Sequence, residues 1–204
     1  MLDKGGPLPI RLVADRLEAG VDEVGRGCLA GPVVAAAVIL PANCLIPNLD
    51  DSKRLTAHQR ELIAVEIKRQ ALAYAIAEAS VEEIDGLNIL RATYLAMNRA
   101  IQQLNPVPEH LLIDGNRFQN NTAIPFDTVV KGDAKVASIA AASILAKTYR
   151  DSHMRELARH YPHYDWEHNM GYGTPKHLYG IQNHGITIHH RRTFAPCQPT
   201  LFDR

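Results

Sequence analysis

Cysteine is scarce in this chain of 204 residues, which carries only Cys28, Cys44 and Cys197. The number is odd, the three positions are far apart, and no two of them form a C-x-x-C pair. This pattern excludes a disulfide-stapled secreted scaffold and a cysteine-based zinc site. We therefore expect reduced thiols and a cytoplasmic protein.

Long hydrophobic runs are also missing. The longest apolar stretch, residues 32–41, is too short to span a bilayer, and the N-terminus lacks the basic-then-apolar pattern of a signal peptide. Hydrophobic residues make up 46% and charged residues 22%, as in a globular protein that buries a core. We expect an N-terminal segment over residues 1–18, one domain over 19–192 and an extended tail over 193–204.

The chain has no net charge, which argues against a general nucleic-acid binder. The charges are unevenly distributed, however. Residues 1–114 carry 11 basic and 15 acidic side chains, a net of −4, whereas residues 115–192 carry 10 and 6, a net of +4. Eight of the ten histidines also lie between His153 and His190. The asymmetry is compatible with an acidic metal site beside a basic phosphate-binding surface, and equally with chance clustering.

Hydrophobic periodicity and capping signals predict alternating strands and helices, hence an α/β fold with a mixed central sheet. Apolar runs flanking a Gly-rich turn predict a hairpin, and Ser or Thr followed three residues later by Glu or Gln marks two helix starts. The expected strands are residues 19–24, 32–40, 71–79, 110–115 and 126–133. The expected helices run from Thr56 to about Gln70, from Ser80 onward, over residues 88–104, from Ala134 to about His160, and from Thr174 to Gly185.

Four acids share one context in this scheme. Asp22 and Glu23 lie late in the first strand, Asp114 ends a second strand, and Asp133 follows a third. Strand ends at one edge of a sheet are where open α/β folds gather functional groups. Converging carboxylates repel one another unless a cation lies between them, and oxygen-only ligands suit Mg²⁺ or Mn²⁺. The alternative is that each acid is a turn residue, the commonest fate of Asp-Gly and Gly-Asp pairs.

Asp22 and Glu23 present a difficulty, since adjacent strand residues point to opposite faces of a sheet. Both can reach one metal only if the strand twists or ends there, or if one residue contributes its backbone carbonyl. Gly25, which follows, makes a local distortion plausible.

The Gly25-Arg26-Gly27 triplet after these acids is not a phosphate-binding P-loop, because no Gly-Lys-Ser/Thr follows it, and no helix follows to make it a dinucleotide site. Two glycines let the backbone approach another surface closely, and Arg26 between them could meet a phosphate. A plain hairpin turn explains the triplet equally well.

Taken together, five motifs resemble the ribonuclease HII family, the type 2 ribonucleases H, in its bacterial type. They are GVDEVGRG, DSKRL, LLIDGN, VVKGDAKVASIAAASILAKTYRD and GYGTPKH, which occur in the family's order over roughly residues 19–190. The resemblance implies a ribonuclease-H-like mixed sheet flanked by helices, with additional C-terminal helices. It also implies metal-dependent hydrolysis of RNA in RNA–DNA hybrids and cleavage at single ribonucleotides embedded in duplex DNA.

By this resemblance the catalytic, metal-binding acids are Asp22, Glu23, Asp114 and Asp133, with Mg²⁺ or Mn²⁺ as cofactor. The family's glycine–arginine–glycine element matches Gly25, Arg26 and Gly27, and its substrate-sensing tyrosine matches Tyr172. Asp151 lies in the family's Arg-Asp pair and is expected near the site. Cys28 departs from the proline that many members carry, which removes some stiffness after the tip.

Candidate phosphate contacts are Lys53 and Lys147, which fall within family motifs, and the weaker candidates Arg54, Arg191 and Arg192. The histidine-rich stretch suggests zinc as an alternative, although its spacing is irregular and it has no cysteine partners.

The tail contains Gln198, Leu201 and Phe202 in the pattern Gln-x-x-Leu-Phe. This resembles the short peptide by which replication and repair proteins dock on the DNA sliding clamp, and two apolar anchors on an extended tail suit a surface pocket. A pattern of five residues also matches by chance.

Two further functions compete with the ribonucleotide-specific nuclease. A metal-dependent DNA nuclease or integrase-like enzyme shares clustered acids but does not need the Gly-Arg-Gly tip and Tyr172. A non-catalytic nucleic-acid binding module does not need the four acids. Because no heptad pattern is present, we expect a monomer.

Overall fold

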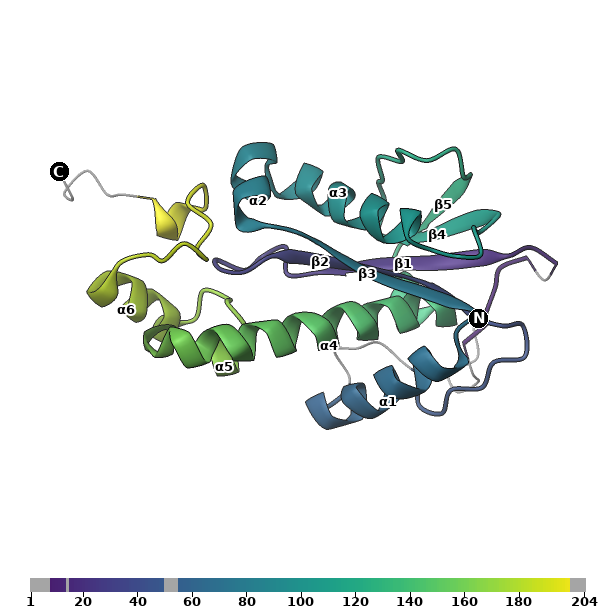
Figure 1. Cartoon of the computed structure of the whole chain (residues 1–204), viewed down its shortest axis with the longest axis horizontal. Coiled ribbons are helices and arrows are strands. Elements are labelled where there is room, and N and C mark those ends of the chain that lie inside the picture. Colours follow the sequence, from purple (N-terminus) through teal and green to yellow (C-terminus); the bar gives the residue numbers. More distant parts are fainter. Residues whose placement is uncertain (1–7, 14, 50–54, 199–204) are drawn as a thin grey trace.

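The computed structural model describes residues 8–13, 15–49 and 55–198. A five-stranded sheet forms its centre and helices cover both faces (Figure 1), which confirms the predicted α/β class. The strands are β1 Glu18–Val24, β2 Val33–Ile39, β3 Ala73–Ala79, β4 His110–Asp114 and β5 Phe126–Val129.

The sheet is mixed, as predicted, with the strand order β3-β2-β1-β4-β5. The pairs β1–β2 and β2–β3 are antiparallel, whereas β1–β4 and β4–β5 are parallel. The carboxyl ends of β1, β4 and β5 therefore lie at the same edge of the sheet, where functional groups of open α/β folds collect.

Three helices begin where the capping signals predict. Thr56 and Ser80 each form a reciprocal capping box, and Thr174 caps its helix with its hydroxyl. The helices are α1 Ala57–Gln70, α2 Val81–Leu87, α3 Ile89–Gln102, α4 Ala137–His160, α5 Trp166–Asn169 and α6 Pro175–His184. Among the described residues, none of these helices is both long and apolar enough to cross a membrane.

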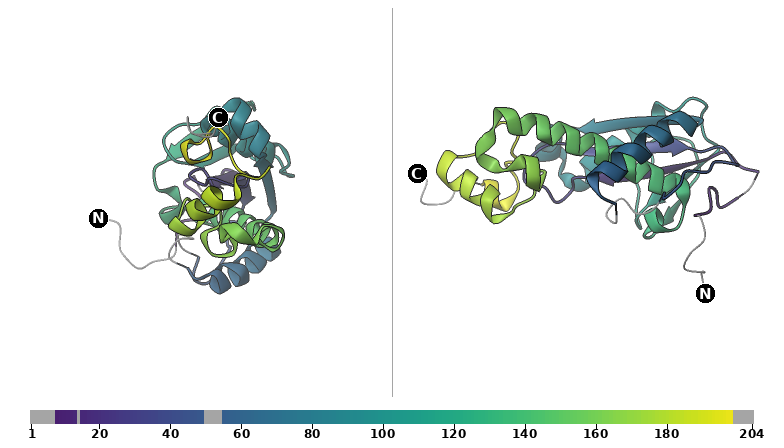
Figure 2. Two further views of the ribbon diagram at one scale, coloured as in Figure 1. Left: turned by 90° about the vertical axis from the view of Figure 1, so that its left-hand side faces the viewer. Right: turned by 90° about the horizontal axis from the view of Figure 1, so that it is seen from below.

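Two apolar cores separate the helices from the sheet. One core lies between the sheet and α2 and α3, and includes Val21 and Met97; the other lies between the sheet and α1 and α4, and includes Val38 and Ile144. Figure 1 shows the resulting three layers, and Figure 2 shows that α5 and α6 extend the molecule at one end.

Gly20 lets α4 cross β1 at very close range. A Cβ atom built on Gly20 would lie 2.2 Å from the carbonyl carbon of Ser138, which belongs to the backbone of α4. Any side chain here would force strand and helix apart, so Gly20 sets the distance between the sheet and the helix that faces Asp22.

Three sequence expectations are wrong in detail. The strand expected to reach Asp133 ends at Val129, and Asp133 lies instead in a 3-10 turn, Gly132–Ala134. The helix expected from Ala134 begins at Ala137, because that turn precedes it. The tail is not extended throughout, since Ala195–Cys197 forms a 3-10 turn. Local hydrogen bonding of short polar segments, rather than apolar periodicity, decides these boundaries.

Candidate active site

Asp22 and Asp114 stand beside each other on the two central parallel strands. The register pairs Val21 of β1 with Ile113 of β4, so one residue further on Asp22 is level with Asp114 on the same face of the sheet. The charge of Asp114 is one cause of the raised pKa of the Asp22 carboxyl. The structure thus brings these two predicted acids together at the carboxyl ends of neighbouring strands.

Asp22 is a buried carboxylate whose hydrogen-bond donors are neutral. It accepts a hydrogen bond from the hydroxyl of Ser143 on α4, and its Oδ1 accepts another from the Glu23 amide at 2.7 Å. Burial, followed by the charges of Glu23 and Asp114, raises the pKa of Asp22 well above its usual value, and the two hydrogen bonds only partly oppose this. The ionised form is therefore costly unless a cation approaches it.

Glu23 lies on the opposite face of β1, as strand alternation requires. Its carboxylate accepts a hydrogen bond from Arg26, with 3.1 Å between Nη1 and Oε1. Burial raises the pKa of Glu23, Arg26 lowers it, and the charge of Asp114 raises it again. Glu23 and Asp114 therefore interact although their strands direct them to different faces.

The end of β4 explains how they interact. The strand stops at Asp114, and Gly115 turns the chain away with a φ of +108°. No residue of β4 consequently lies beside Glu23, so side chains from both faces can meet around the sheet edge. A hollow of about 140 Å³ opens at this point, lined by Glu23, Asp114 and Arg26 together with Thr93, Tyr94 and Met97 of α3.

Asp133 is connected to Asp114 through the turn that contains it. The amide of Gly132 donates a hydrogen bond of 2.6 Å to Oδ1 of Asp114, and Asp133 is the next residue, with only 5% of its surface exposed. The expectation that Asp133 ends a strand is wrong, but the 3-10 turn still places it one residue from an amide that holds Asp114.

The donor set fits a hard divalent cation. Asp22, Glu23 and Asp114 offer only oxygen ligands. Burial, followed by repulsion from neighbouring carboxylates, raises the pKa of Asp22 and Glu23, and a bound Mg²⁺ or Mn²⁺ ion would offset both effects. Among the described residues, no three of the four predicted acids bring ligand atoms within 4.8 Å of one another. The group that does so is Asp165, Glu167 and His168, at the molecular surface near α5.

The Gly25-Arg26-Gly27 tip, which is separated from the acids of β1 by Val24, lies against the loop that carries Tyr172. A Cβ atom on Gly27 would lie 3.8 Å from Cε1 of Tyr172. The amide of Leu29 donates to the Gly171 carbonyl at 2.7 Å, and the Cys28 thiol shares a hydrogen bond with the Tyr172 hydroxyl. Burial, followed by the neighbouring Cys28, raises the pKa of Tyr172, a residue that is nevertheless 43% exposed.

Comparison with known proteins decides the family. A family model described as Ribonuclease HII matches residues 19–197. The ribonuclease HII of Phocaeicola vulgatus is 58% identical over 180 residues, which cover 88% of this chain and 90% of that protein; the ribonuclease HII of Bacteroides thetaiotaomicron has the same identity and coverage. The chain belongs to the ribonuclease HII family. This confirms the bacterial resemblance and supports a ribonuclease H type of endonuclease.

Solved structures of related enzymes share the fold. The structure of the PCNA:RNase HII complex from Archaeoglobus fulgidus superposes with a TM-score of 0.75 at 25% identity, covering 92% of this chain and all of that chain. Ribonuclease H2 from Pyrococcus horikoshii OT3 gives 0.73 at 24% identity, covering 88% and 94%. Bst-RNase HIII, solved with Mn²⁺, gives 0.70 at 20%, covering 91% and 69%. The predicted ribonuclease-H-like fold is confirmed.

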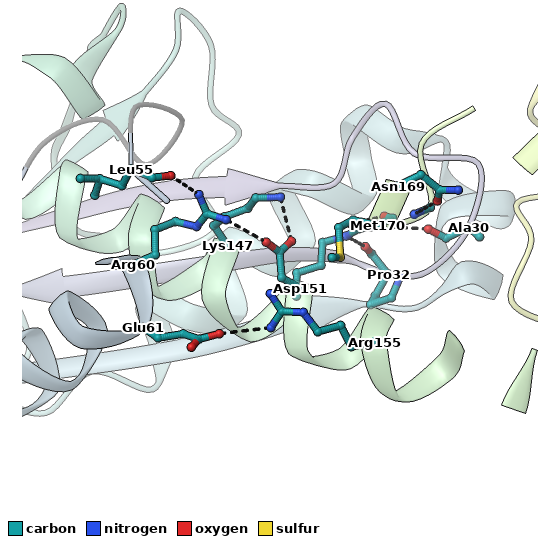
Figure 3. Close-up of polar contacts among 12 residues, drawn as sticks. Ala30, Pro32, Leu55, Arg60, Glu61, Lys147, Asp151, Arg155, Asn169 and Met170 are labelled. Atoms are coloured by element: carbon teal, nitrogen blue, oxygen red, sulfur yellow. Dashed lines mark hydrogen bonds and ion pairs between the residues drawn. The ribbon is translucent and has the colours of Figure 1, made fainter. Parts of the chain in front are cut away.

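Asp151, which the family resemblance expects near the site, is a buried carboxylate between two cations. Lys147 donates to its Oδ1 at 2.7 Å, and Arg60 of α1 approaches its Oδ2 at 3.3 Å. Figure 3 shows both cations converging on this carboxylate. Arg60 also donates to the Leu55 carbonyl at 2.7 Å. Through these two contacts Arg60 connects the segment before α1 with Asp151 of α4. Lys147 as a substrate contact stays a prediction, and Lys53 lies outside the described residues.

A buried network of neutral rings supports the Tyr172 loop. His177 donates from Nδ1 to the Tyr172 carbonyl at 2.9 Å, so its Nε2 accepts from Trp166 at 3.0 Å. His190 accepts at Nδ1 from the Thr187 amide at 2.9 Å, so its Nε2 carries the proton and donates to His177 at 3.1 Å. Burial lowers the pKa of His177, and it lowers that of His190 to about 3. These histidines pack the loop; they do not form the zinc site considered from the sequence.

Two functional candidates were missed or misread from the sequence. Arg191, expected as a phosphate contact, is fully buried and donates to backbone carbonyls, so that expectation is wrong. Arg150 is also fully buried. A signal for Arg150 existed: it stands four residues from Ala146 and Met154 on the apolar stripe of a helix, where a charge needs a dedicated set of partners.

Proposed function

We propose that this member of the ribonuclease HII family is a metal-dependent endoribonuclease that cleaves the RNA strand of RNA–DNA hybrids and cuts at single ribonucleotides embedded in duplex DNA. Its products carry a 5′-phosphomonoester, and its role is ribonucleotide removal in replication and repair in the bacterial cytoplasm. The observation that carries the proposal is that the Gly25-Arg26-Gly27 tip, one residue after the acids of β1, lies against Tyr172.

The acids hold the cofactor in this proposal. Asp22, Glu23, Asp114 and Asp133 would together hold two Mg²⁺ or Mn²⁺ ions. Bound metal ions of this kind lower the pKa of an attacking water and stabilise the leaving 3′-oxygen of the scissile phosphodiester. Ser143 and the Glu23 amide hold the Asp22 carboxylate in place, and the Gly132 amide does the same for Asp114.

The tip supplies selectivity for ribose. Only the 2′-hydroxyl distinguishes RNA from DNA at a given position. A backbone with glycine on both sides of Arg26 can enter the minor groove closely enough to hydrogen-bond that hydroxyl. The exposed face of Tyr172 then stacks on the neighbouring sugar or base, a contact that favours a deoxynucleotide on that side. Lys147, and Lys53 beyond the described residues, position the phosphates without reading sequence.

Cleavage of three matched duplexes tests the proposal. They share one sequence and contain all DNA, one ribonucleotide, or a full RNA strand. We expect Mg²⁺- or Mn²⁺-dependent cleavage of the second and third and none of the first. Cleavage of all three at similar rates would instead indicate a DNA nuclease of integrase-like type, and binding without cleavage would indicate a non-catalytic module.

The tail carries a second part of the proposal, docking on a DNA sliding clamp through Gln198, Leu201 and Phe202. The RNase HII from Archaeoglobus fulgidus was solved as a complex with PCNA. Gln198 follows the turn Ala195–Cys197, and the two apolar anchors lie outside the described residues. Deletion of residues 198–204 should leave cleavage of short duplexes intact and abolish binding to the immobilised clamp. Unchanged clamp binding would refute the docking role.

A further inference from the structure

The buried side chain of Arg191 forms hydrogen bonds with the backbone of the Gly25-Arg26-Gly27 tip. Its Nη2 donates to the Gly25 carbonyl at 2.6 Å, and its Nη1 donates to the Arg26 carbonyl at 2.9 Å. Its Nε and Nη2 both donate to the Gly31 carbonyl, at 3.0 and 2.9 Å. The guanidinium thus binds both arms of the loop that separates β1 from β2, and no part of it is exposed.

The backbone around Arg191 is bound to the same loop. His190 forms an antiparallel bridge with Ala30, the Gly31 amide donates to the His189 carbonyl at 2.9 Å, and the Arg191 amide donates to the Leu29 carbonyl at 2.8 Å. The guanidinium carbon also lies 5.1 Å from the ring centre of Phe194. Ring and bridge together restrict the rotamer of Arg191, so its contacts with the tip are held in one geometry.

Arg191 is charged, but its hydrogen-bond partners in the described part of the chain are backbone carbonyls. Burial lowers the pKa of Arg191 to about 10, so it remains protonated at neutral pH. Within the described ranges no carboxylate forms an ion pair with it; Asp85, the acid whose charge it senses, binds the amides of Arg192 and Thr193 instead. The positive charge is therefore stabilised by carbonyl dipoles, and in turn it polarises them.

We propose that Arg191 is a positioning residue for ribose recognition, which orients and strengthens the outward-facing amides of the tip. In a trans peptide the N–H points opposite to the C=O, and within the described ranges the only cis bond is Asn105–Pro106. With the Gly25 and Arg26 carbonyls turned inward to Arg191, the amides of Arg26 and Gly27 point away from it. Polarised carbonyls make these amides better donors. The inference rests on the proposed function.

Arg150 forms hydrogen bonds with the segments next to the tip and to the Tyr172 loop. It donates to the carbonyls of Ala30 at 2.9 Å, Pro32 at 3.0 Å and Met170 at 2.8 Å, acceptors that are labelled in Figure 3. Met170 precedes the loop of Tyr172, so Arg150 joins that loop to the returning arm. Unlike Arg191, Arg150 donates to carbonyls outside the tip. Its role is to hold the segment of Ala30 and Pro32 against the segment of Met170.

Binding measured without cleavage tests the role of Arg191. In an Asp22→Asn background, fluorescence anisotropy at one fixed salt concentration gives Kd for a one-ribonucleotide duplex and for the matching all-DNA duplex. We expect Arg191→Lys and Arg191→Gln to lower the preference for the ribonucleotide by about 10-fold, with Kd for all-DNA unchanged. Arg159→Gln, which removes an exposed arginine paired with Glu156, should preserve the preference.

A second readout does not depend on the substrate. In ¹H–¹⁵N spectra of the free protein, Arg191→Gln should move the amide protons of Arg26 and Gly27 upfield, because their carbonyl partners lose a charged donor. Arg159→Gln should leave both signals in place. The proposal is overturned if these signals do not move, if the preference is unchanged, or if both duplexes weaken equally.

The same experiments distinguish a failure of the proposed function from a failure of the role proposed for Arg191. A parent protein that shows no preference for the ribonucleotide refutes ribose recognition itself, and the amide shifts still decide whether Arg191 polarises the tip. If neither variant keeps the native circular dichroism, Arg191 is needed for folding and the positioning role is rejected.

Discussion

Asp22 and Glu23 are neighbours in the chain but belong to opposite faces of the sheet. Asp22 accepts a hydrogen bond from Ser143 on α4, whereas Glu23 lines a hollow with Thr93 and other residues of α3. Because β4 ends at Asp114, no strand residue lies beside Glu23 at this edge of the sheet. Both carboxylates can therefore interact with Asp114. The site is built at a place where the two faces of the sheet meet.

Asp22→Asn should stabilise the metal-free protein at pH 8. The raised pKa of Asp22 means that the native state holds a proton that the unfolded state releases first. Its contribution to stability is therefore full below the usual carboxyl pKa and is lost as the pH rises through the raised value. Urea unfolding in EDTA should show a gain of roughly 1 kcal/mol or more at pH 8, and little difference near pH 3.

Added Mg²⁺ should make the wild type more stable than Asp22→Asn, the reverse of the order in EDTA. Metal that binds only the native state raises the Tm of the wild type, and it should raise that of Asp22→Asn much less. Glu156→Gln, which alters an exposed carboxylate, is the control and should follow the wild type. An equal Mg²⁺ response in wild type and Asp22→Asn would place the metal elsewhere.

Gly20→Ala should destabilise the protein by about 3 kcal/mol, because the new methyl group meets the backbone of α4 rather than a side chain that can move. Gly86→Ala is the matched control: nothing lies within 4 Å of its Cβ, and alanine favours α2 by up to about 1 kcal/mol. Chemical denaturation measures both. Similar values for the two variants would mean that β1 and α4 do not pack as described.

Stability should fall as the pH drops from about 6.5 towards 3, because of His190. Its pKa of about 3 in the native state lies below the unfolded value of 6.5, so the unfolded state takes up the proton first. Stability present above pH 6.5 is therefore lost on acidification, by about 2 kcal/mol between pH 7 and pH 5. His190→Gln should flatten this slope, and exposed His160→Gln should not. Equal slopes would contradict the neutral ring network.

Tyr172→Ala should lower kcat/KM on a one-ribonucleotide duplex by about 10-fold or more, the size expected for loss of one aromatic stack. Tyr172→Phe removes only the hydroxyl that bonds Cys28 and should cost a few-fold at most. Tyr179→Ala, at a 66% exposed position on α6, serves as control. A Phe variant as impaired as the Ala variant would show that the hydroxyl, not the ring, is used.

Much of the fold was predictable because its signals are local. The capping boxes at Thr56 and Ser80 and the alternation in β3 depend on residues close in sequence, and the structure confirms them. The convergence of Asp22 with Asp114 followed from a topological rule about strand ends. Asp133 was misplaced because it lies in the 3-10 turn Gly132–Ala134, which is closed by local hydrogen bonds such as that from the Lys135 amide to the Gly132 carbonyl and which apolar periodicity does not reveal.

The roles of the buried arginines could not be predicted in the same way. Arg191 resembles any surface arginine until the C-terminal segment pairs with Ala30, a partner 160 positions earlier. The three carbonyls that it binds lie in a loop without periodicity, so only the tertiary structure brings donor and acceptors together.

Cleavage of a duplex containing one ribonucleotide tests the central claim most directly, with wild type, Asp22→Asn and Asp114→Asn each assayed in Mg²⁺, Mn²⁺ or EDTA. The account predicts cleavage by the wild type with either metal, none in EDTA, and a loss of at least about 100-fold in both variants. Cleavage in EDTA, or a variant that retains wild-type activity, would contradict it.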